Sequence, residues 1–404
     1  MVTQLSKKQQ NTMVLLLSVT YFVSYITRTN FAAIISEIEN STGVSKSLLS
    51  LSITSSFVSY GIGQIVSGFF GDSFSPKKLV KYGLSITVLM NGVLPFCSSP
   101  YLMAAVWCIN GFAQAFIWPP IIKIMSALFS SSDYEKAAVK VNWGGSLGTI
   151  AVYLAAPIII SALSWKYVFL FSAIIGLAMI GLWGRCCYEP PMVPSSERNC
   201  PDVSKKTPFF TPLIGCIMLV IILQGMLRDG VTTWMPSLLL ETYHMDGLVA
   251  ILTGVLLPIF SIISFQVTSY LYRNIFHNPV LCSGVVFGVG ACAAFLLARY
   301  SGANVVLSVA CSALLTGCMH GVNLIMVSML PAYFNETGNV STVSGILNSC
   351  TYVGSAISTY GIAVLTEKFD WSFTLHIWLL TAILGTIIAL ACARPWQKKM
   401  QLHA

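Results

Sequence analysis

The sequence predicts an all-α membrane protein in which twelve transmembrane helices form two six-helix bundles related by pseudo-twofold symmetry. The 404 residues are 55% hydrophobic and only 9% charged, whereas ordinary globular chains are about 25% charged. The chain also divides into apolar segments of membrane-spanning length, and its halves share a residue register. These observations exclude a soluble globular fold, a disordered chain and a secreted disulfide scaffold.

A bilayer core about 30 Å thick is crossed by about 20 helical residues. Residues 1–10 have the charge of a signal peptide, but the apolar run after them continues to Ser36 without a small-residue cleavage site. We therefore expect a retained first helix. The twelve predicted helices are residues 12–36, 47–71, 79–98, 101–129, 137–162, 165–187, 209–240, 248–272, 279–298, 303–331, 341–366 and 371–393.

One long polar break, residues 188–207, divides six predicted helices from six. The expected domains are an N-terminal bundle (residues 1–187), a cytoplasmic linker (188–207) and a C-terminal bundle (208–404). A cytoplasmic N-terminus puts fifteen Lys and Arg residues inside and four outside, the latter being Lys46, Lys166, Arg299 and Lys368. This bias predicts a multi-pass protein of the cell (inner) membrane with both termini cytoplasmic.

The halves align at an offset of 206 residues, which pairs Gly111 with Gly317, Asn142 with Asn348, Gly148 with Gly354 and Trp165 with Trp371. The same offset pairs Gln114 with His320. Such matches are typical of duplicated six-helix units that form a pathway at their interface near the midplane of the bilayer.

Several other classes of function are disfavoured. The twelve cysteines have no spacing that would frame a disulfide network or a zinc site. The loops contain no GxxxxGK[ST] sequence, and the predicted helices contain no paired carboxylates or nucleophile and base. The net charge of +8 is scattered between the helices, which disfavours nucleic-acid binding. We expect a monomer in the lipid bilayer that is not an enzyme, with no catalytic residue, metal or cofactor.

Two arginines, Arg28 and Arg228, lie within the first predicted helix of each half. An arginine at the centre of the bilayer costs roughly 2.5 kcal/mol or more, so it is expected to face a wet cavity or a partner. Two guanidinium groups that face one cavity repel each other unless an anion or a counter-charge lies between them. Their bidentate geometry suits phosphate or carboxylate, so the sequence predicts a small anionic cargo.

Asp229 offers an alternative interpretation, in which it neutralises Arg228. Adjacent helical residues point about 100° apart and are not expected to face each other. Asp229 is otherwise expected to pair with another helix or to carry a coupling proton. His320, between two glycines, is either a structural residue or a titratable contact of the substrate.

Other polar residues within the predicted helices have two interpretations each. Tyr21 and Tyr25 share a helical face with Arg28 and either donate hydrogen bonds to an anion or pack. Lys123, near the cytoplasmic end of its helix, is either a gate residue or an interfacial anchor. Five amides are interhelical contacts by default, and some of them are candidates for lining the cavity: Gln64, Gln114, Gln224, Asn323 and Asn348.

Several short patterns carry a resemblance that covers nearly the whole chain. They are Tyr21, Tyr25 and Arg28 with Asn30 and Phe31; Tyr60 and Gly61; Gly68, Gly71 and Asp72 with Pro76, Lys77 and Lys78; Trp118, Pro119 and Pro120 with Lys123; and Arg228 with Trp234 and Pro236. In these patterns the chain resembles the major facilitator superfamily, and within it the organophosphate:phosphate antiporter family, which includes the bacterial glycerol-3-phosphate transporter.

The resemblance implies two six-helix bundles that alternate access by a rocker-switch movement. It also implies that Arg28 and Arg228 hold a phosphoryl group and that His320 stands where the glycerol-3-phosphate transporter has a substrate-site tyrosine. The chain departs from the family at Gln64, which replaces a lysine, at Ser146 or a neighbour, which replaces a histidine, and at Gly225, which replaces a tyrosine. A dianionic phosphate ester is therefore expected to be held less strongly.

The sequence thus predicts a secondary transporter of a small organic anion, most simply a phosphorylated metabolite exchanged for inorganic phosphate. One alternative is a proton-coupled symporter of a carboxylate such as a sugar acid, in which Asp229 or His320 carries the proton. Another is a transporter-like membrane sensor of an anionic metabolite. The expected substrate-site residues are Arg28, Arg228, Tyr21, Tyr25, Tyr60, Gln64 and His320, and the expected gate or vestibule residues are Lys123 and Asp72.

Overall fold

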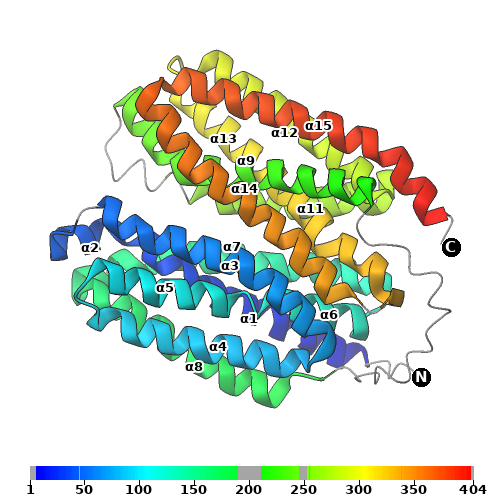
Figure 1. Cartoon of the computed structure of the whole chain (residues 1–404), viewed down its shortest axis with the longest axis horizontal. Helices are drawn as coiled ribbons and strands as arrows, with labels where there is room; N and C mark the ends of the chain where they lie inside the picture. Colours follow the sequence, from blue (N-terminus) through cyan, green and yellow to red (C-terminus); the bar gives the residue numbers. More distant parts are fainter. Residues whose placement is uncertain are drawn as a thin grey trace.

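The computed structural model describes residues 6–44, 46–189, 211–244, 253, 255–337 and 339–401, and the regular elements in these ranges are all helices. Figure 1 shows the helices of the first half of the chain beside those of the second half. The first half comprises α1 (Lys7–Ala33), α2 (Ile35–Thr42), α3 (Lys46–Ser73), α4 (Pro76–Val93), the 3₁₀ turn η1 (Leu94–Phe96), α5 (Pro100–Gln114), α6 (Trp118–Leu128), α7 (Ser131–Ala162) and α8 (Trp165–Cys186).

The second half begins after residues 190–210, so most of the predicted linker lies outside the described residues. The start of the predicted helix at 248–272 lies outside them too. The second half comprises α9 (Pro212–Tyr243), α11 (Leu256–Leu271), the π-helical η3 (Tyr272–Phe276), α12 (Pro279–Tyr300), α13 (Val305–Asn323), the π-helical η4 (Leu324–Met329), the 3₁₀-helical η5 (Leu330–Thr337), α14 (Val340–Lys368) and α15 (Trp371–Gln401).

Simple capping rules account for many of the helix starts. Proline lacks an amide hydrogen and has a helical φ angle, so the first position of a helix suits it. It begins α4, α5, α9 and α12, as Pro76, Pro100, Pro212 and Pro279. Ser130 caps α7 by accepting a hydrogen bond from the amide of Asp133.

Within the described residues, ten helical segments are long and apolar enough to cross a membrane. Two further helices complete the twelve that were predicted. The described part of α11 is only 16 residues long, and α14 is rich in serine and threonine. Ser341, Ser344 and Ser355 of α14 are buried inside the protein. The polarity of α14 therefore reflects contacts with other helices rather than with lipid.

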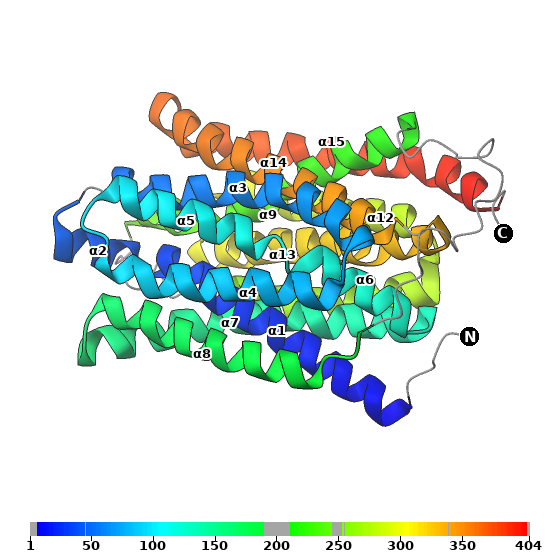
Figure 2. The ribbon, with the colours of Figure 1, turned by 60° about the horizontal axis from the view of Figure 1, so that its bottom comes forward.

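The two halves repeat one packing scheme. In the first half α1 packs against α7, α3 against α5 and α4 against α8; in the second half α9 packs against α14, α11 against α13 and α12 against α15 (Figures 1 and 2). In both halves the first span therefore contacts the fifth, the second contacts the fourth and the third contacts the sixth. This agreement confirms the predicted pair of related six-helix bundles.

The paired glycines lie at equivalent close approaches between helices. A Cβ atom on Gly148 would meet the backbone oxygen of Phe22 in α1, and one on Gly354 would meet that of Ile222 in α9. Close backbone approach at small residues is how membrane helices commonly associate. The offset of 206 residues therefore matches positions with the same packing role.

One predicted helix, residues 101–129, is interrupted between Gln114 and Trp118. Pro119 cannot donate to the carbonyl four residues earlier, that of Ala115, and its ring disfavours a continuous helix. Gln64 of α3 supplies the donor that this carbonyl lacks, because its Nε2 atom donates to the Ala115 oxygen over 3.3 Å. The Trp-Pro-Pro pattern thus separates α5 from α6. The predicted helix at 303–331 is likewise divided into α13, η4 and η5.

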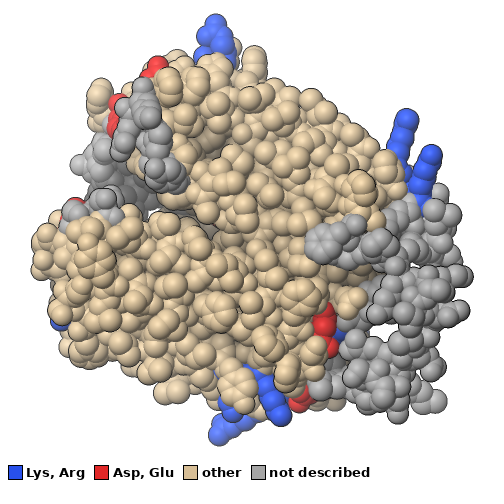
Figure 3. All heavy atoms as spheres, viewed as in Figure 1, with Lys and Arg blue, Asp and Glu red and all other residues tan. Residues whose placement is uncertain are grey.

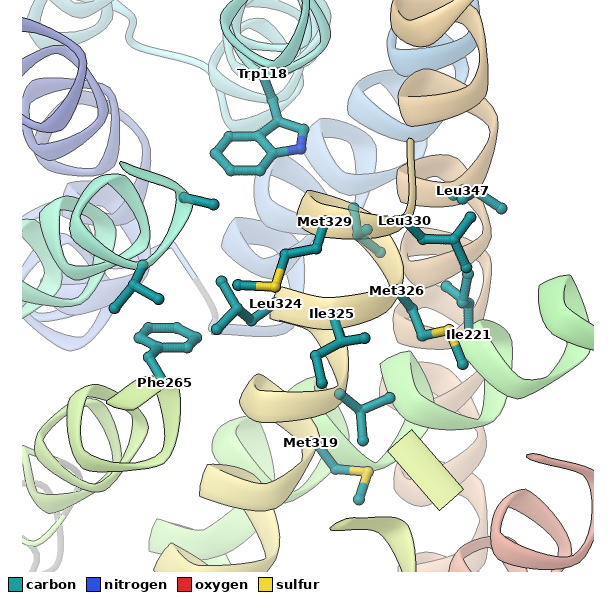
Figure 4. Packing of buried hydrophobic residues seen from close by; sticks show 14 of the residues in the cluster. Trp118, Ile221, Phe265, Met319, Leu324, Ile325, Met326, Met329, Leu330 and Leu347 are labelled. Carbon is teal, nitrogen blue, oxygen red and sulfur yellow. The ribbon is translucent and has the colours of Figure 1, made fainter. Parts of the chain in front are cut away.

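The two bundles meet along α3 and α14 and along α7 and α11. Tyr134 donates to the backbone oxygen of Ser328, and Asn142 donates to the Ser328 hydroxyl over 3.2 Å. Apolar side chains of η4 pack in the same region, where Figure 4 shows Trp118 and Phe265 on one side of η4 and the side chains labelled Ile221 and Leu347 on the other. These contacts close the bundles together toward the end that carries both chain termini (Figure 1).

The broad face seen in Figure 3 is almost entirely uncharged, and lysine, arginine and acidic side chains lie at its margins. Large apolar side chains such as Leu154, Ile158 and Leu177 are exposed, at 55%, 69% and 62%. A surface of this kind suits a hydrocarbon solvent rather than water.

Candidate functional site

Arg28 and Arg228 approach one aromatic side chain at the interface of the bundles, Tyr352 of α14. The Nη1 atom of Arg28 donates to the Tyr352 hydroxyl over 3.3 Å. The Cζ atom of Arg228 lies 5.8 Å from the centroid of the Tyr352 ring. The first helix of each half therefore supplies one arginine to the same region.

Aromatic rings surround the Arg28 guanidinium. Its Cζ atom lies 4.2 Å from the ring centroid of Tyr25 and 4.8 Å from that of Tyr60. The Tyr60 and Tyr352 rings lie 4.4 Å apart. A cation over aromatic faces gains about 0.5–2 kcal/mol from each of them, so these tyrosines hold the guanidinium in place.

Tyr21 lies one step further from Arg28. Its hydroxyl is 3.5 Å from that of Tyr25, and its ring packs against Trp118 at 4.7 Å. Of the two interpretations offered by the sequence, packing describes Tyr21 better, whereas Tyr25 contacts the arginine directly.

Asp229 contradicts one expectation from the sequence. The Nε and Nη2 atoms of Arg228 donate to the two carboxylate oxygens of Asp229 over 2.7 and 2.8 Å. Ser355 of α14 also donates to Asp229. The expectation that adjacent residues do not pair was wrong, because the long arginine side chain bends back to its neighbour. Arg228 is only 7% exposed, and its charge is balanced locally.

His320 of α13 borders this ion pair. It lies within electrostatic range of Arg228 and Asp229, and its ring packs edge-on against Phe265 at 5.8 Å. The side chain is half-buried. This position keeps it a candidate for the substrate site.

Gln64, a predicted substrate-site residue, connects the two bundles in this structure. The side chain is fully buried. Its amide nitrogen donates to the Ala115 carbonyl, and its amide oxygen accepts from Asn348 over 3.0 Å. The amide therefore joins the two bundles, which was the alternative interpretation of this residue.

The sequence analysis missed Tyr352 and Ser355. Both lie on α14, four and seven residues after Asn348, a spacing that shares one helical face. The offset of 206 residues also pairs Tyr352 with Ser146, the position at which the resemblance had drawn attention to a missing histidine. That pairing was the signal that would have identified Tyr352.

Asp72 and Lys123 form an ion pair nearer the chain termini, where Asp72 also contacts the other bundle. Lys123 Nζ lies 3.2 Å from Asp72 Oδ1. The Asp72 carboxylate also accepts the backbone amides of Ser341 and Thr342, over 3.1 and 2.7 Å. Asp72 thus caps the first turn of a helix in the other bundle, where anions are stabilised. Asp72 therefore joins the two bundles at this end of the molecule, and Lys123 pairs with it.

Replacement of Asp72 by asparagine is expected to loosen this end of the molecule. A hydrogen bond to a charged group contributes about 1.5–3 kcal/mol, so the amides of Ser341 and Thr342 should exchange hydrogen about tenfold faster or more. Hydrogen–deuterium exchange in detergent measures this. The matched control is Asp133→Asn, an aspartate in the first turn of its own helix, which should leave these two amides unchanged. Unaltered exchange in the Asp72 variant would contradict the gate.

Within the described residues, no group of three or more His, Cys, Asp or Glu side chains is placed to hold a metal ion. The site itself contains two arginines, one carboxylate, one imidazole and several phenols. Such groups can bind and orient an anion through hydrogen bonds and charge.

Comparison with known proteins assigns the family. The family model for the Major Facilitator Superfamily matches residues 17–359. The chain is 22% identical over 379 residues to the membrane sensor protein UhpC of Salmonella typhimurium, covering 87% of this chain and 84% of that one. It is 29% identical over 163 residues to the glycerol-3-phosphate transporter of Bacillus subtilis, covering 38% and 35%. It is 30% identical over 131 residues to a probable hexose phosphate transport protein of Chlamydia pneumoniae, covering 31% and 29%.

Solved structures share the fold. The proton:xylose symporter XylE superposes with a TM-score of 0.79 at 12% identity, over 96% of this chain and 95% of that one. The transporter FucP in its outward conformation superposes with a TM-score of 0.75 at 12% identity, over 94% and 98%. The chain therefore belongs to the major facilitator superfamily as an integral multi-pass membrane protein, and its relatives agree with the organophosphate:phosphate antiporter family.

Proposed function

We propose that this protein is a secondary transporter of a small organic anion, most simply a phosphorylated metabolite exchanged for inorganic phosphate. The observation that carries the proposal is the meeting of Arg28 and Arg228, one from each bundle, beside Tyr352. Relatives described as transporters of glycerol 3-phosphate and hexose phosphate support the same class of cargo.

The position of this pair supports alternating access as the mechanism. Along α14, the amide of Ser341 that contacts Asp72 precedes Tyr352 by a rise of about 16 Å. Contacts between the bundles lie on that side of the arginines. An anion bound between the two arginines contacts both bundles and draws them together, which biases the equilibrium between the two open states. We propose that the closed end faces the cytoplasm, together with both termini.

Exchange in proteoliposomes tests the proposal. Vesicles loaded with inorganic phosphate should take up labelled phosphate, and external glycerol 3-phosphate or glucose 6-phosphate should compete for that uptake. Empty vesicles serve as the control. Uptake of a carboxylate that requires an inward proton gradient, with no phosphate exchange, would favour a proton-coupled symporter in its place.

A second candidate function is a membrane sensor of an anionic metabolite. The specific observation that favours it is the match to UhpC, which extends over 87% of the chain and is the broadest of the three relatives compared above. A sensor binds the anion without moving it. Saturable binding by purified protein, together with no flux in the vesicles, would support this function over transport.

A further inference from the structure

The two arginines of the site differ in their counter-charges. Among the described residues, ion pairs join Arg228 to Asp229 and Lys123 to Asp72. Arg28 instead meets the rings of Tyr25 and Tyr60 and the hydroxyl of Tyr352. The pair of arginines is therefore asymmetric, with one guanidinium balanced by a carboxylate and one surrounded by phenols.

The Asp229 carboxylate occupies the edge of the Arg228 guanidinium at which the anionic group of a ligand would bind. Its two oxygens occupy the Nε and Nη2 edge of the guanidinium at 2.7 and 2.8 Å, which is the geometry that a carboxylate or phosphate of a ligand would adopt. Ser355 also donates a hydrogen bond to this carboxylate. The Asp229 side chain is 20% exposed, so a ligand that approaches Arg228 on this edge meets Asp229 first.

The formal charges of Arg28, Arg228 and Asp229 leave one positive charge in the site. His320, Tyr25 and Tyr352 also lie within electrostatic range of Arg228 and Asp229, and in their neutral forms they add no charge. A singly charged anion brings the site to neutrality. A dianion leaves one uncompensated negative charge beside Asp229, where the surrounding protein and membrane screen it poorly.

We propose that Asp229 determines the charge class of the cargo and restricts this transporter to singly charged anions. The inference depends on the proposed function, which places the anion between the two arginines. The cargo is then the singly protonated form of a phosphate ester, or a carboxylate or sulfate ester of similar size. Without the carboxylate of Asp229, the site has two positive charges and suits a dianion.

Two esters of equal shape and different charge test this proposal. At pH 8 glucose 6-sulfate carries one negative charge, whereas glucose 6-phosphate carries about two, because its second ionisation lies near pH 6. Their dissociation constants are measured by calorimetry on purified full-length protein. The wild type should bind the sulfate ester at least tenfold more tightly than the phosphate ester. In Asp229→Asn this ratio should fall at least tenfold, so that the phosphate ester binds as tightly or better.

Two matched variants separate charge from structure. Ser355→Ala removes a hydrogen bond to Asp229 but keeps its charge, and Asp229→Glu keeps the charge at greater length. Both should retain the preference of the wild type for the sulfate ester. An equal ratio in the wild type and Asp229→Asn would overturn the inference while leaving anion binding intact. Failure of all the proteins to bind either ester would overturn the proposed function as well.

Discussion

Replacement of Arg28 by lysine is expected to reduce phosphate exchange in proteoliposomes about a hundredfold or more without unfolding the protein. Lysine keeps the positive charge, but its compact ammonium cannot form a planar fork. It also cannot lie flat against the rings of Tyr25 and Tyr60, which contact the guanidinium at 4.2 and 4.8 Å. A hydrogen bond to a charged group is worth about 1.5–3 kcal/mol, and about 1.4 kcal/mol is a factor of ten.

A second arginine provides a control for this substitution. Arg299, in the last turn of α12, lies 5.5 Å from the ring of Tyr300, so Arg299→Lys makes the same chemical change against an aromatic ring away from the site. Exchange should then match the wild type. Elution of Arg28→Lys as a monodisperse peak, with an unchanged melting temperature, would show that the loss is functional. Normal exchange in Arg28→Lys would refute the role of Arg28 in holding the anion.

Most of the fold could be predicted because the bilayer imposes it. A membrane-spanning segment must satisfy its own backbone hydrogen bonds and must be apolar, and both requirements leave a local mark on the sequence. The interruption before Trp118 was not predicted, although the sequence contains Pro119 and Pro120 at this point. Prolines are tolerated in membrane helices when neighbours satisfy the freed carbonyl. Only the structure shows that Gln64 takes this role at Ala115.

The site was harder to predict than the fold. Arg28 and Arg228 were visible because a charge in an apolar helix is costly wherever it points. Tyr352 could not be predicted in this way, because a tyrosine in a membrane helix is common and costs little free energy. Its role in the site comes from contacts with two arginines that lie more than a hundred residues away in the sequence. The pairing of Arg228 with Asp229 depends on a side-chain rotamer, which helical periodicity does not determine.

The polar face of α14 links the candidate site to Asp72, the predicted gate residue. Along this helix Thr342 contacts Asp72, Asn348 contacts Gln64, Tyr352 contacts Arg28 and Ser355 contacts Asp229. Apart from Asp229, each of these partners belongs to the other bundle. A movement of α14 relative to the first bundle therefore changes the contacts of Asp72 and those of Arg28 together. The proposed alternating access requires such coupling, because a ligand shifts a conformational equilibrium only through contacts that differ between the states.

Replacement of Gly354 by alanine is expected to lower the melting temperature of the protein by several degrees. Its Cβ would clash with the backbone oxygen of Ile222 in α9, and a backbone atom within a helix cannot move aside as a side chain can. Overpacking of this kind costs about 1–3 kcal/mol. A Cβ atom added to Gly361, on the same helix, would meet no other atom within 4 Å. Gly361→Ala should leave stability unchanged or raise it by about 0.5–1 kcal/mol, the intrinsic helical preference for alanine.

The symmetry of the fold makes this experiment stronger. Gly148, paired with Gly354 by the offset of 206 residues, faces the backbone of Phe22 in α1, so Gly148→Ala should destabilise the protein by a similar amount. A Cβ atom on Gly181 of α8 would have open space within 4 Å, so Gly181→Ala serves as its control. Fluorimetric melting of the four variants in detergent gives the comparison. If Gly354→Ala and Gly148→Ala melt like their controls, these contacts do not hold the fifth span of each half against the first.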